Sequence, residues 1–220
     1  MNIFDTIFYQ PLLKALLFFY ELQPAGLGGA VILMTAAIKV LLFPLNKKSI
    51  DSQKALSKLQ PKLKKVQKEH KDDKEKMGRE VMALYKEAGI NPFSSILLLV
   101  VQTPILIALY QVFRQAPGRE GINPFFLGIN LSEPNTILAL AGAALLFVQM
   151  KITSADTPAP SGKDGGGFQA SFQKQMQYIF PVFIFFVLIK VPSAIGVYLV
   201  VSGVLSVLEK KLIDALSGGK

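Results

Sequence analysis

Five blocks of apolar residues dominate the sequence. They cover residues 26–45, 93–113, 136–150, 178–191 and 193–208. The first two have the roughly 20 residues that cross a hydrocarbon core unaided. The other three are shorter, so the bilayer must thin locally or these helices must extend into their polar flanks. A soluble protein of 220 residues would need amphipathic helices, whereas these blocks are apolar on nearly every face. The pattern therefore predicts an all-α membrane protein with five transmembrane helices.

Residues 1–24 have an amphipathic pattern instead. Apolar side chains recur there at intervals of about one helical turn, and Pro11 interrupts them. This spacing indicates a helix that lies on the membrane surface. A sixth span is the alternative, which Lys14, Pro11 and Glu21 weaken. The stretch lacks the basic start and the cleavage site of a signal peptide, so the first span is expected to act as its own insertion signal.

The segment 46–91 is polar and basic, and it carries two apolar stripes. The polar residues 69–73 separate the stripes, which predicts an antiparallel helical hairpin whose apolar faces meet. Gly89 is suited to end the second helix, and Asn91-Pro92 is suited to begin the next span. The two stripes consist of Leu56, Leu59, Leu63 and Val66, and of Met77, Val81, Leu84 and Tyr85.

The distribution of charge predicts the orientation of the chain. The hairpin segment holds 13 Lys and Arg against 7 Asp and Glu, a net of +6, whereas residues 114–135 are neutral. Because basic loops stay in the cytoplasm, the hairpin and the C-terminus are expected inside and the N-terminus outside. Lys210 and Lys211 agree with this orientation, and Lys190 does not. The predicted order is an interfacial helix (1–24), a first span (25–45), the cytoplasmic hairpin (46–91), a second span (92–113), an external loop (114–135), a third span (136–150), a flexible loop (151–174), a fourth span (175–191), a fifth span (192–209) and a short cytoplasmic tail (210–220).

Composition narrows the possible chemistry. With no Cys and one His, the sequence predicts no disulfide and no metal site. The glycines at 165–167 lack the lysine and helix of a phosphate-binding loop. Ser193 has no general base, because His70 lies in the hairpin. The sequence therefore predicts neither an enzyme nor a cofactor. The net charge of +9 gathers mainly in the hairpin, and no specific nucleic-acid site is expected.

Lys39 is the most informative polar residue within a span. A charge at the centre of a span costs roughly 2.5 to 3.5 kcal/mol on insertion scales, and Lys39 lies about 9 Å inside the expected cytoplasmic end at 1.5 Å per residue. Its side chain either snorkels to the interface or faces a water-filled cavity in the bundle. Thr35, one turn earlier, favours a polar strip. Gln102, Gln149 and Ser202 are further polar residues of the spans, which either bond a neighbouring helix or line the same interior.

The order of these features resembles that of the YidC, Oxa and Albino insertases, in particular their short bacterial members. The resemblance covers about residues 25 to 210, and the run from Tyr85 to Pro92 is its most specific piece. At the position of the family's groove arginine this chain has Lys39, which retains the charge but not the bidentate geometry. Leu199 and Gly203 replace an aromatic residue and an asparagine of the family. The other matching stretches are 38–45, 82–84, 99–105, 109–110, 175–181 and 192–194 with Tyr198.

This resemblance implies a five-helix bundle around a hydrophilic groove, which opens to the cytoplasm and sideways to lipid. Nascent membrane proteins would pass their polar parts through the groove without nucleotide hydrolysis, in the inner membrane of a bacterium. The implied groove residues are Lys39, Thr35, Gln102, Gln149 and Ser202, the implied slide for the apolar segment is Tyr198 and Leu199, and the hairpin lysines expected to contact a ribosome or general translocon are Lys58, Lys62, Lys64 and Lys65. The alternatives are a small channel or transporter, and an assembly scaffold that does not insert its clients.

Overall fold

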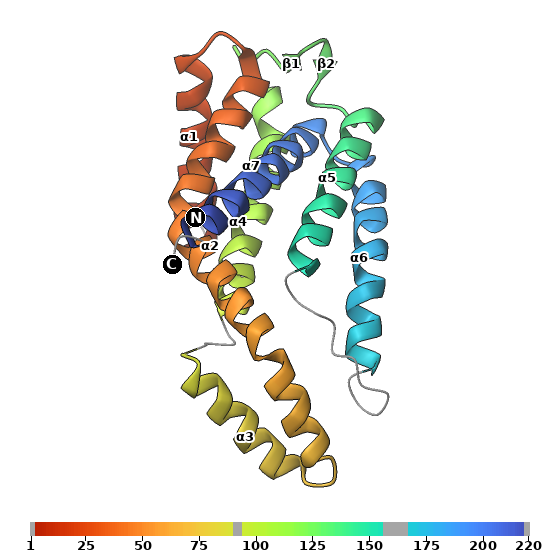
Figure 1. Ribbon diagram of the computed structural model, residues 1–220. Coiled ribbons are helices and arrows are strands. Elements are labelled where there is room, and N and C mark those ends of the chain that lie inside the picture. Colours follow the sequence, from red (N-terminus) through yellow and green to blue (C-terminus); the bar gives the residue numbers. More distant parts are fainter. Residues whose placement is uncertain (1–2, 90–93, 156–166, 218–220) are drawn as a thin grey trace.

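The computed structural model describes residues 3–89, 94–155 and 167–217, and it is mostly helical, as the sequence predicts (Figure 1). The centre of the predicted flexible loop, the Asn91-Pro92 helix start and the end of the predicted tail lie outside the described residues. The elements are a π-helical turn Asp5–Tyr9, α1 (Gln10–Leu22), α2 (Gly26–Glu69), α3 (Lys74–Glu87), α4 (Ser94–Gln115), a 3-10 turn Ala116–Gly118, β1 (Phe125–Phe126), β2 (Ile129–Asn130), α5 (Thr136–Ala155), α6 (Gly167–Leu188) and α7 (Ser193–Ser217).

Several helices extend beyond the apolar blocks that the sequence marks. The first span and the first arm of the hairpin form one 44-residue helix, α2, which contains Pro44 and Pro61. Residues 151–155 and 167–174 belong to α5 and α6 rather than to a loop, and residues 210–217 continue α7 rather than forming a tail. Glutamine and lysine are good helix formers, so a helix does not have to stop where its apolar block stops.

Two helices of the described residues are long and apolar enough to cross a membrane by length and composition. They are α2 and the Ser193–Leu216 part of α7. Shorter apolar stretches occupy Thr136–Ile152 in α5 and Gln177–Leu188 in α6. The number of spans therefore stays a proposal.

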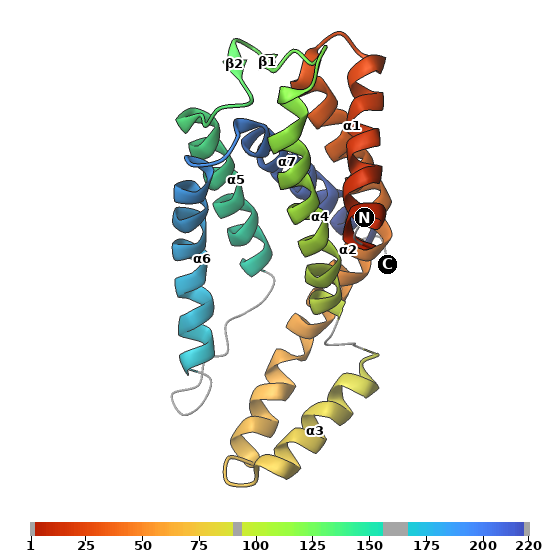
Figure 2. The same ribbon diagram turned by 180° about the vertical axis from the view of Figure 1, so that it is seen from behind.

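The apolar core lies at the end of the bundle opposite the hairpin, between α1, the first half of α2, the second half of α4 and the start of α7 (Figures 1 and 2). Leu16, Leu27, Val31 and Phe113 are fully buried there. The segment between α4 and α5 covers this end. Its two short antiparallel strands, which the sequence analysis did not predict, pair Phe125 with Asn130 and Phe126 with Ile129.

The first helix stands alongside the bundle. Leu13 and Leu16 of α1 are buried in the core, and the Tyr9 hydroxyl donates a hydrogen bond of 2.6 Å to Gln115 Oε1 at the end of α4. Near its other end, the Tyr20 hydroxyl accepts a bond of 2.7 Å from the backbone N–H of Asn123. The apolar stripe of this helix thus packs in one cluster with core residues of α2 and α4, and α1 lies beside these two helices in Figure 2. Its predicted position on the membrane surface stays a prediction.

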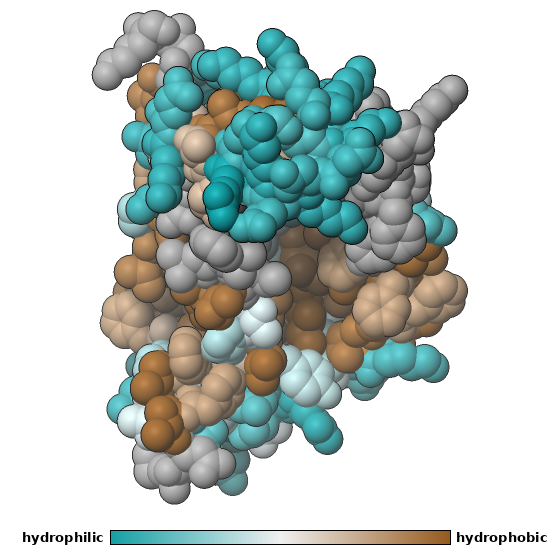
Figure 3. Space-filling model, turned by 90° about the horizontal axis from the view of Figure 1, so that it is seen from below, coloured by the Kyte–Doolittle hydropathy of each residue, from teal (hydrophilic) through white to brown (hydrophobic). Residues whose placement is uncertain are grey.

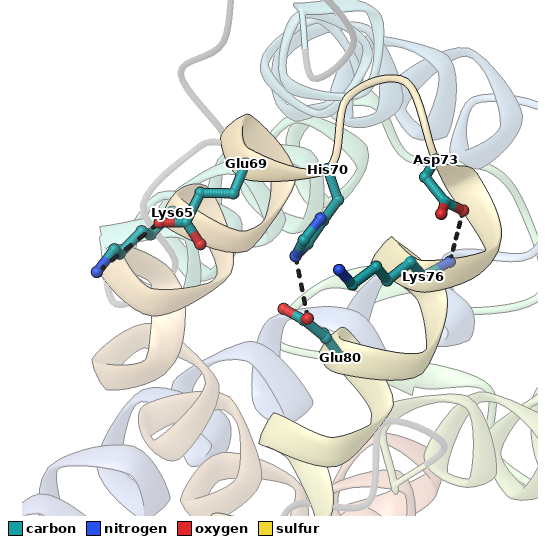
Figure 4. Close-up of polar contacts among 6 residues, drawn as sticks. All are labelled: Lys65, Glu69, His70, Asp73, Lys76 and Glu80. Atoms are coloured by element: carbon teal, nitrogen blue, oxygen red, sulfur yellow. Dashed lines mark hydrogen bonds and ion pairs between the residues drawn. The ribbon is translucent and has the colours of Figure 1, made fainter.

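The hairpin consists of the second half of α2 and α3. The two apolar stripes meet there, with Leu59 and Leu63 packed against Val81, Leu84 and Tyr85. At its tip the Asp73 carboxylate caps α3 by accepting a bond of 2.9 Å from the backbone N–H of Lys76 (Figure 4). His70 Nε2 lies 3.0 Å from Glu80 Oε1, and Lys65 Nζ lies 3.8 Å from Glu69 Oε1.

Close packing of α5 on α7 depends on three glycines. A Cβ at Gly196 would lie 3.1 Å from the Leu138 Cβ, and a Cβ at Gly203 would lie 3.2 Å from the Leu145 Cβ. A Cβ at Gly142 would approach Leu188 and Leu199 in the same way. These distances leave little room for a side chain. The two helices can therefore cross this closely because glycine occupies these positions.

We expect Gly196→Val to destabilise the protein by about 1 to 3 kcal/mol, the usual cost of overpacking a well-packed contact. Thermal unfolding in detergent micelles, followed by far-ultraviolet circular dichroism, measures the effect. Gly78→Val is the matched control, because a Cβ at Gly78 meets nothing within 4 Å. Equal unfolding midpoints for the two variants would contradict the close crossing.

Candidate functional site: a polar groove between the helices

A cavity of about 330 Å³ lies between α2, α4, α5 and α7. Along α2, the apolar core residues come first, the residues that line the cavity come next, and the residues of the hairpin contact come last. We call this cavity the groove. It is lined by Lys39, Asn46, Ser49, Ile50, Gln53, Gln102, Leu106, Gln149, Ile152, Tyr198, Leu199, Ser202, Ser206, Val207, Glu209 and Lys210.

Helical periodicity brings the polar groups of the groove together. On α2, Asn46, Ser49 and Gln53 follow one another at intervals of three and four residues, which places them on one face of the helix. On α7, Ser202, Ser206 and Glu209 repeat the same spacing. Because α2 and α7 pack against each other, the two polar faces meet.

Lys39 is the central cation of the groove. Its Nζ donates a hydrogen bond of 2.6 Å to Ser206 Oγ on α7. The Ser206 hydroxyl in turn donates a bond of 2.8 Å to the backbone oxygen of Ser202. The lysine therefore extends across the groove to a neighbouring helix instead of reaching along its own helix toward the hairpin.

The inner part of the groove is formed by Gln102 and Tyr198. Gln102 Nε2 donates a hydrogen bond of 3.0 Å to the Tyr198 hydroxyl, which links α4 to α7. The Tyr198 ring is buried and lies 6.4 Å from the ring of Phe113, between centroids. This contact joins the groove directly to the apolar core.

The part of the groove nearer the hairpin contains groups that the sequence analysis missed. Asn46 Nδ2 donates a hydrogen bond of 3.2 Å to Glu209 Oε2, and Lys210 Nζ donates one of 2.6 Å to the backbone oxygen of Ile152. Next to the groove, Lys54 Nζ lies 2.6 Å from the carboxylate of Asp214. The sequence could have predicted these residues from their helical spacing relative to Lys39 and Ser202, if that spacing had been followed past the ends of the apolar blocks.

Most of the expected groove residues do line the cavity, and Thr35 does not. Lys39, Gln102, Gln149 and Ser202 are among the lining residues. Thr35 is buried and its hydroxyl donates a bond of 2.6 Å to the backbone oxygen of Val31. A threonine inside a helix can satisfy its hydroxyl in this way, so Thr35 is compatible with the apolar core beside it.

The two residues expected to form a slide lie in different environments. Tyr198 is buried and Leu199 is partly exposed, and both line the groove. The hairpin lysines lie far from it along α2. Of these, Lys58, Lys62 and Lys65 are exposed, and Lys64 is partly buried.

The outer faces of the helices are strongly apolar. Val40 and Leu41 on α2 are about three-quarters exposed, at 75% and 76%, and Val182, Phe183 and Phe186 on α6 are more than half exposed. Viewed from below, the hairpin presents a hydrophilic surface and the flanks of the molecule are largely hydrophobic (Figure 3). Exposed apolar surface of this extent marks a membrane or a protein partner. Within the described ranges, no group of three or more His, Cys, Asp or Glu side chains is arranged to hold a metal ion.

A helical bundle with apolar outer faces, a polar groove between its helices and a basic hairpin defines a membrane protein that keeps polar surface inside the bundle. The family model described as 60Kd inner membrane protein matches residues 18–217. The chain belongs to this family, which is the insertase family that its sequence resembles, and not a family of enzymes.

Relatives of similar length support this assignment. A membrane protein insertase YidC of Clostridium tetani is 35% identical over 199 residues, which cover 88% of this chain and 86% of that protein. That of Oceanobacillus iheyensis is 31% identical over 218 residues, with coverages of 97% and 84%. A longer YidC of Nitratidesulfovibrio vulgaris is 33% identical over 212 residues, and the matched region is 91% of this chain but 37% of that protein.

We expect Ser202→Cys to react with a charged, membrane-impermeant thiol reagent at least about tenfold faster than Thr35→Cys. The reactive thiolate needs water and is favoured by a nearby cation such as Lys39. Both variants replace a hydroxyl with a thiol, although Thr35→Cys also removes the γ-methyl group, and the chain has no other cysteine to react. Labelling in membrane vesicles followed by mass spectrometry measures the rates. Equal rates would show that the groove is not hydrated.

Proposed function

We propose that this chain is a membrane protein insertase that passes the polar segments of nascent membrane proteins through its groove. The observation that carries the proposal is a cavity with Lys39 and Gln102 on its walls, in a bundle whose outer faces are apolar. A charged residue at the centre of a lipid-exposed span costs roughly 2.5 to 3.5 kcal/mol. Polar partners in the groove reduce that cost. The groove also shortens the distance through hydrocarbon that a polar segment must cross. The fold therefore does not require nucleotide hydrolysis for insertion.

The proposed topology has five spans, corresponding to α2, α4, α5, α6 and α7. The net charge of +6 on segment 46–91 supports a cytoplasmic hairpin, an external N-terminus and a cytoplasmic C-terminus. The apolar core then closes the groove on the outer side. A continuous pore, as a channel requires, would have to pass through the fully buried side chains of this core.

The apolar segment of the client is proposed to leave the groove sideways, between α5 and α7 and the lipid. Leu199 supports this route, because it lines the groove and is partly exposed. Tyr198 is buried and bonded to Gln102. In this arrangement Tyr198 forms the wall of the groove, and contact with a sliding segment falls to Leu199 and its neighbours.

We expect Lys39→Glu to lower insertion of a single-span client with an acidic external segment by about tenfold or more, and Lys39→Arg to retain insertion. Arginine keeps the charge that attracts the segment, whereas glutamate repels it. Purified protein in liposomes, with protease protection of the client as the readout, gives the measurement. Photo-crosslinks from Gln102 and Leu199 to a stalled client form the second readout. If the original chain forms crosslinks but inserts no more client than empty liposomes do, the result favours a scaffold. If it gives neither crosslinks nor insertion, the insertase proposal is removed.

The exposed lysines of the hairpin are proposed to contact a ribosome or a general translocon. We expect the double variant Lys58→Gln and Lys62→Gln to weaken ribosome binding severalfold at low salt and to lose this difference in high salt, because contacts between exposed charges are screened by ions. Co-sedimentation with ribosomes measures the binding. The double variant Arg114→Gln and Arg119→Gln, which removes two exposed cations at the end of the molecule opposite the hairpin, serves as the control. Equal weakening by both double variants would remove the proposed contact.

A further inference from the structure

Glu209 is the only acidic residue that lines the groove in the part of the chain that the structure describes. It lies on α7 three residues beyond Ser206, which binds Lys39, and so on the same face of the helix. Its position is nearer the hairpin than that of Lys39, because its partner Asn46 follows Lys39 by two turns of α2. A segment that enters from the hairpin side reaches Glu209 before it reaches Lys39.

The two oxygens of the Glu209 carboxylate are in different situations. Oε2 accepts the hydrogen bond from Asn46 Nδ2. Oε1 is buried, with no hydrogen-bond partner among the described residues. Lys39 donates to Ser206, and Lys210 donates to the backbone oxygen of Ile152. Buried polar atoms are normally satisfied, so an unpartnered carboxylate oxygen on a residue that lines the cavity calls for a donor.

A segment that enters the groove therefore meets two opposite charges, first that of Glu209 and then that of Lys39. An acceptor at Glu209 suits a cationic or hydrogen-bond-donating group, whereas the Lys39 ammonium suits an anionic one. Hydrogen bonds to an ionised group are stronger than those between neutral groups, so either side chain can discriminate between substrates of different charge.

We infer that Glu209 is a substrate-binding residue of the groove, which accepts lysine or arginine side chains of the translocated segment at Oε1. It thereby makes segments with a single basic residue suitable clients, and Lys39 does the same for acidic segments. This inference rests on the proposed insertase function and adds the class of client that Glu209 selects. Asn46 holds the carboxylate in place through Oε2 and is a positioning residue.

The test uses three single-span clients that differ only in one residue of the translocated segment, which is Lys, Gln or Glu. Insertion is measured in liposomes without a membrane potential, with the full chain. We expect Glu209→Gln to lower insertion of the Lys client by about tenfold, the scale of a lost charge-assisted hydrogen bond. Insertion of the Gln client should stay within about twofold, and insertion of the Glu client should not fall. Glu209→Asp should restore part of the preference for the Lys client.

Each result bears on the inference. Glu120→Gln is the control, because it removes the same charge from an exposed position in the segment opposite the hairpin. An equal loss for all three clients would show that Glu209 has only a structural role and would overturn the inference, as would an undiminished Lys client. The ratio between clients is unaffected by a loss of folded protein. If the original chain does not insert even the Gln client, the proposed function fails and the inference fails with it.

A second readout tests contact directly. The chain has no cysteine, so Glu209→Cys provides a single thiol. We expect it to form a disulfide with a client that carries a cysteine beside its Lys, when the client is stalled during insertion and a mild oxidant is added to take up the two electrons of the bond. Glu120→Cys should form none. Equal crosslinking at the two positions would overturn the inference.

Discussion

The solvation of one ammonium group inside the bundle is the constraint on which the rest of this structure depends. A cation surrounded by hydrocarbon is costly, so α2 has to present Lys39 to polar neighbours. It does so by packing against α7, where Ser206 Oγ accepts a hydrogen bond of 2.6 Å from Lys39 Nζ. Ser206 is itself satisfied by donating to Ser202 on the same helix. The polar face of α2 and the polar face of α7 therefore satisfy each other's polar groups, and their pairing forms the groove.

The same two helices separate the apolar end of the molecule from the polar one. Up to Met34, α2 packs into the core with α1 and α4, and from Lys39 onward it lines the groove. Tyr198 of α7 belongs to both regions, since its ring contacts the core and its hydroxyl bonds Gln102. A bundle that is tightly packed at one end and polar at the other is suited to admit a segment from one side. It is not suited to conduct a solute through.

Periodicity in the sequence predicted the helices, the paired stripes of the hairpin and a polar interior that includes Lys39 and Gln102. It did not predict the two-residue strands, because they are too short to show an alternating pattern. Asn46 and Glu209 were missed because they lie at or beyond the ends of the apolar blocks, where polar residues are ordinary. Only the contact between α2 and α7 turns them into parts of a site. Thr35 is not among the residues that line the groove, and its hydroxyl bonds an acceptor within its own helix.

The departures from the resembled family have a common physical logic. At position 203, where the resemblance implies an asparagine, Gly203 allows the close approach of α5 to α7, and a side chain there would press on Leu145. Polar contact at this point is exchanged for tight packing. At position 39 the lysine brings three rotatable donors, of which Ser206 receives one, in place of the fixed fork of an arginine. A point charge on a flexible stem makes weaker geometric demands on its partner. A groove that binds many unrelated segments gains from that tolerance, and the nearby Glu209 carboxylate extends the range of segments to those of opposite charge.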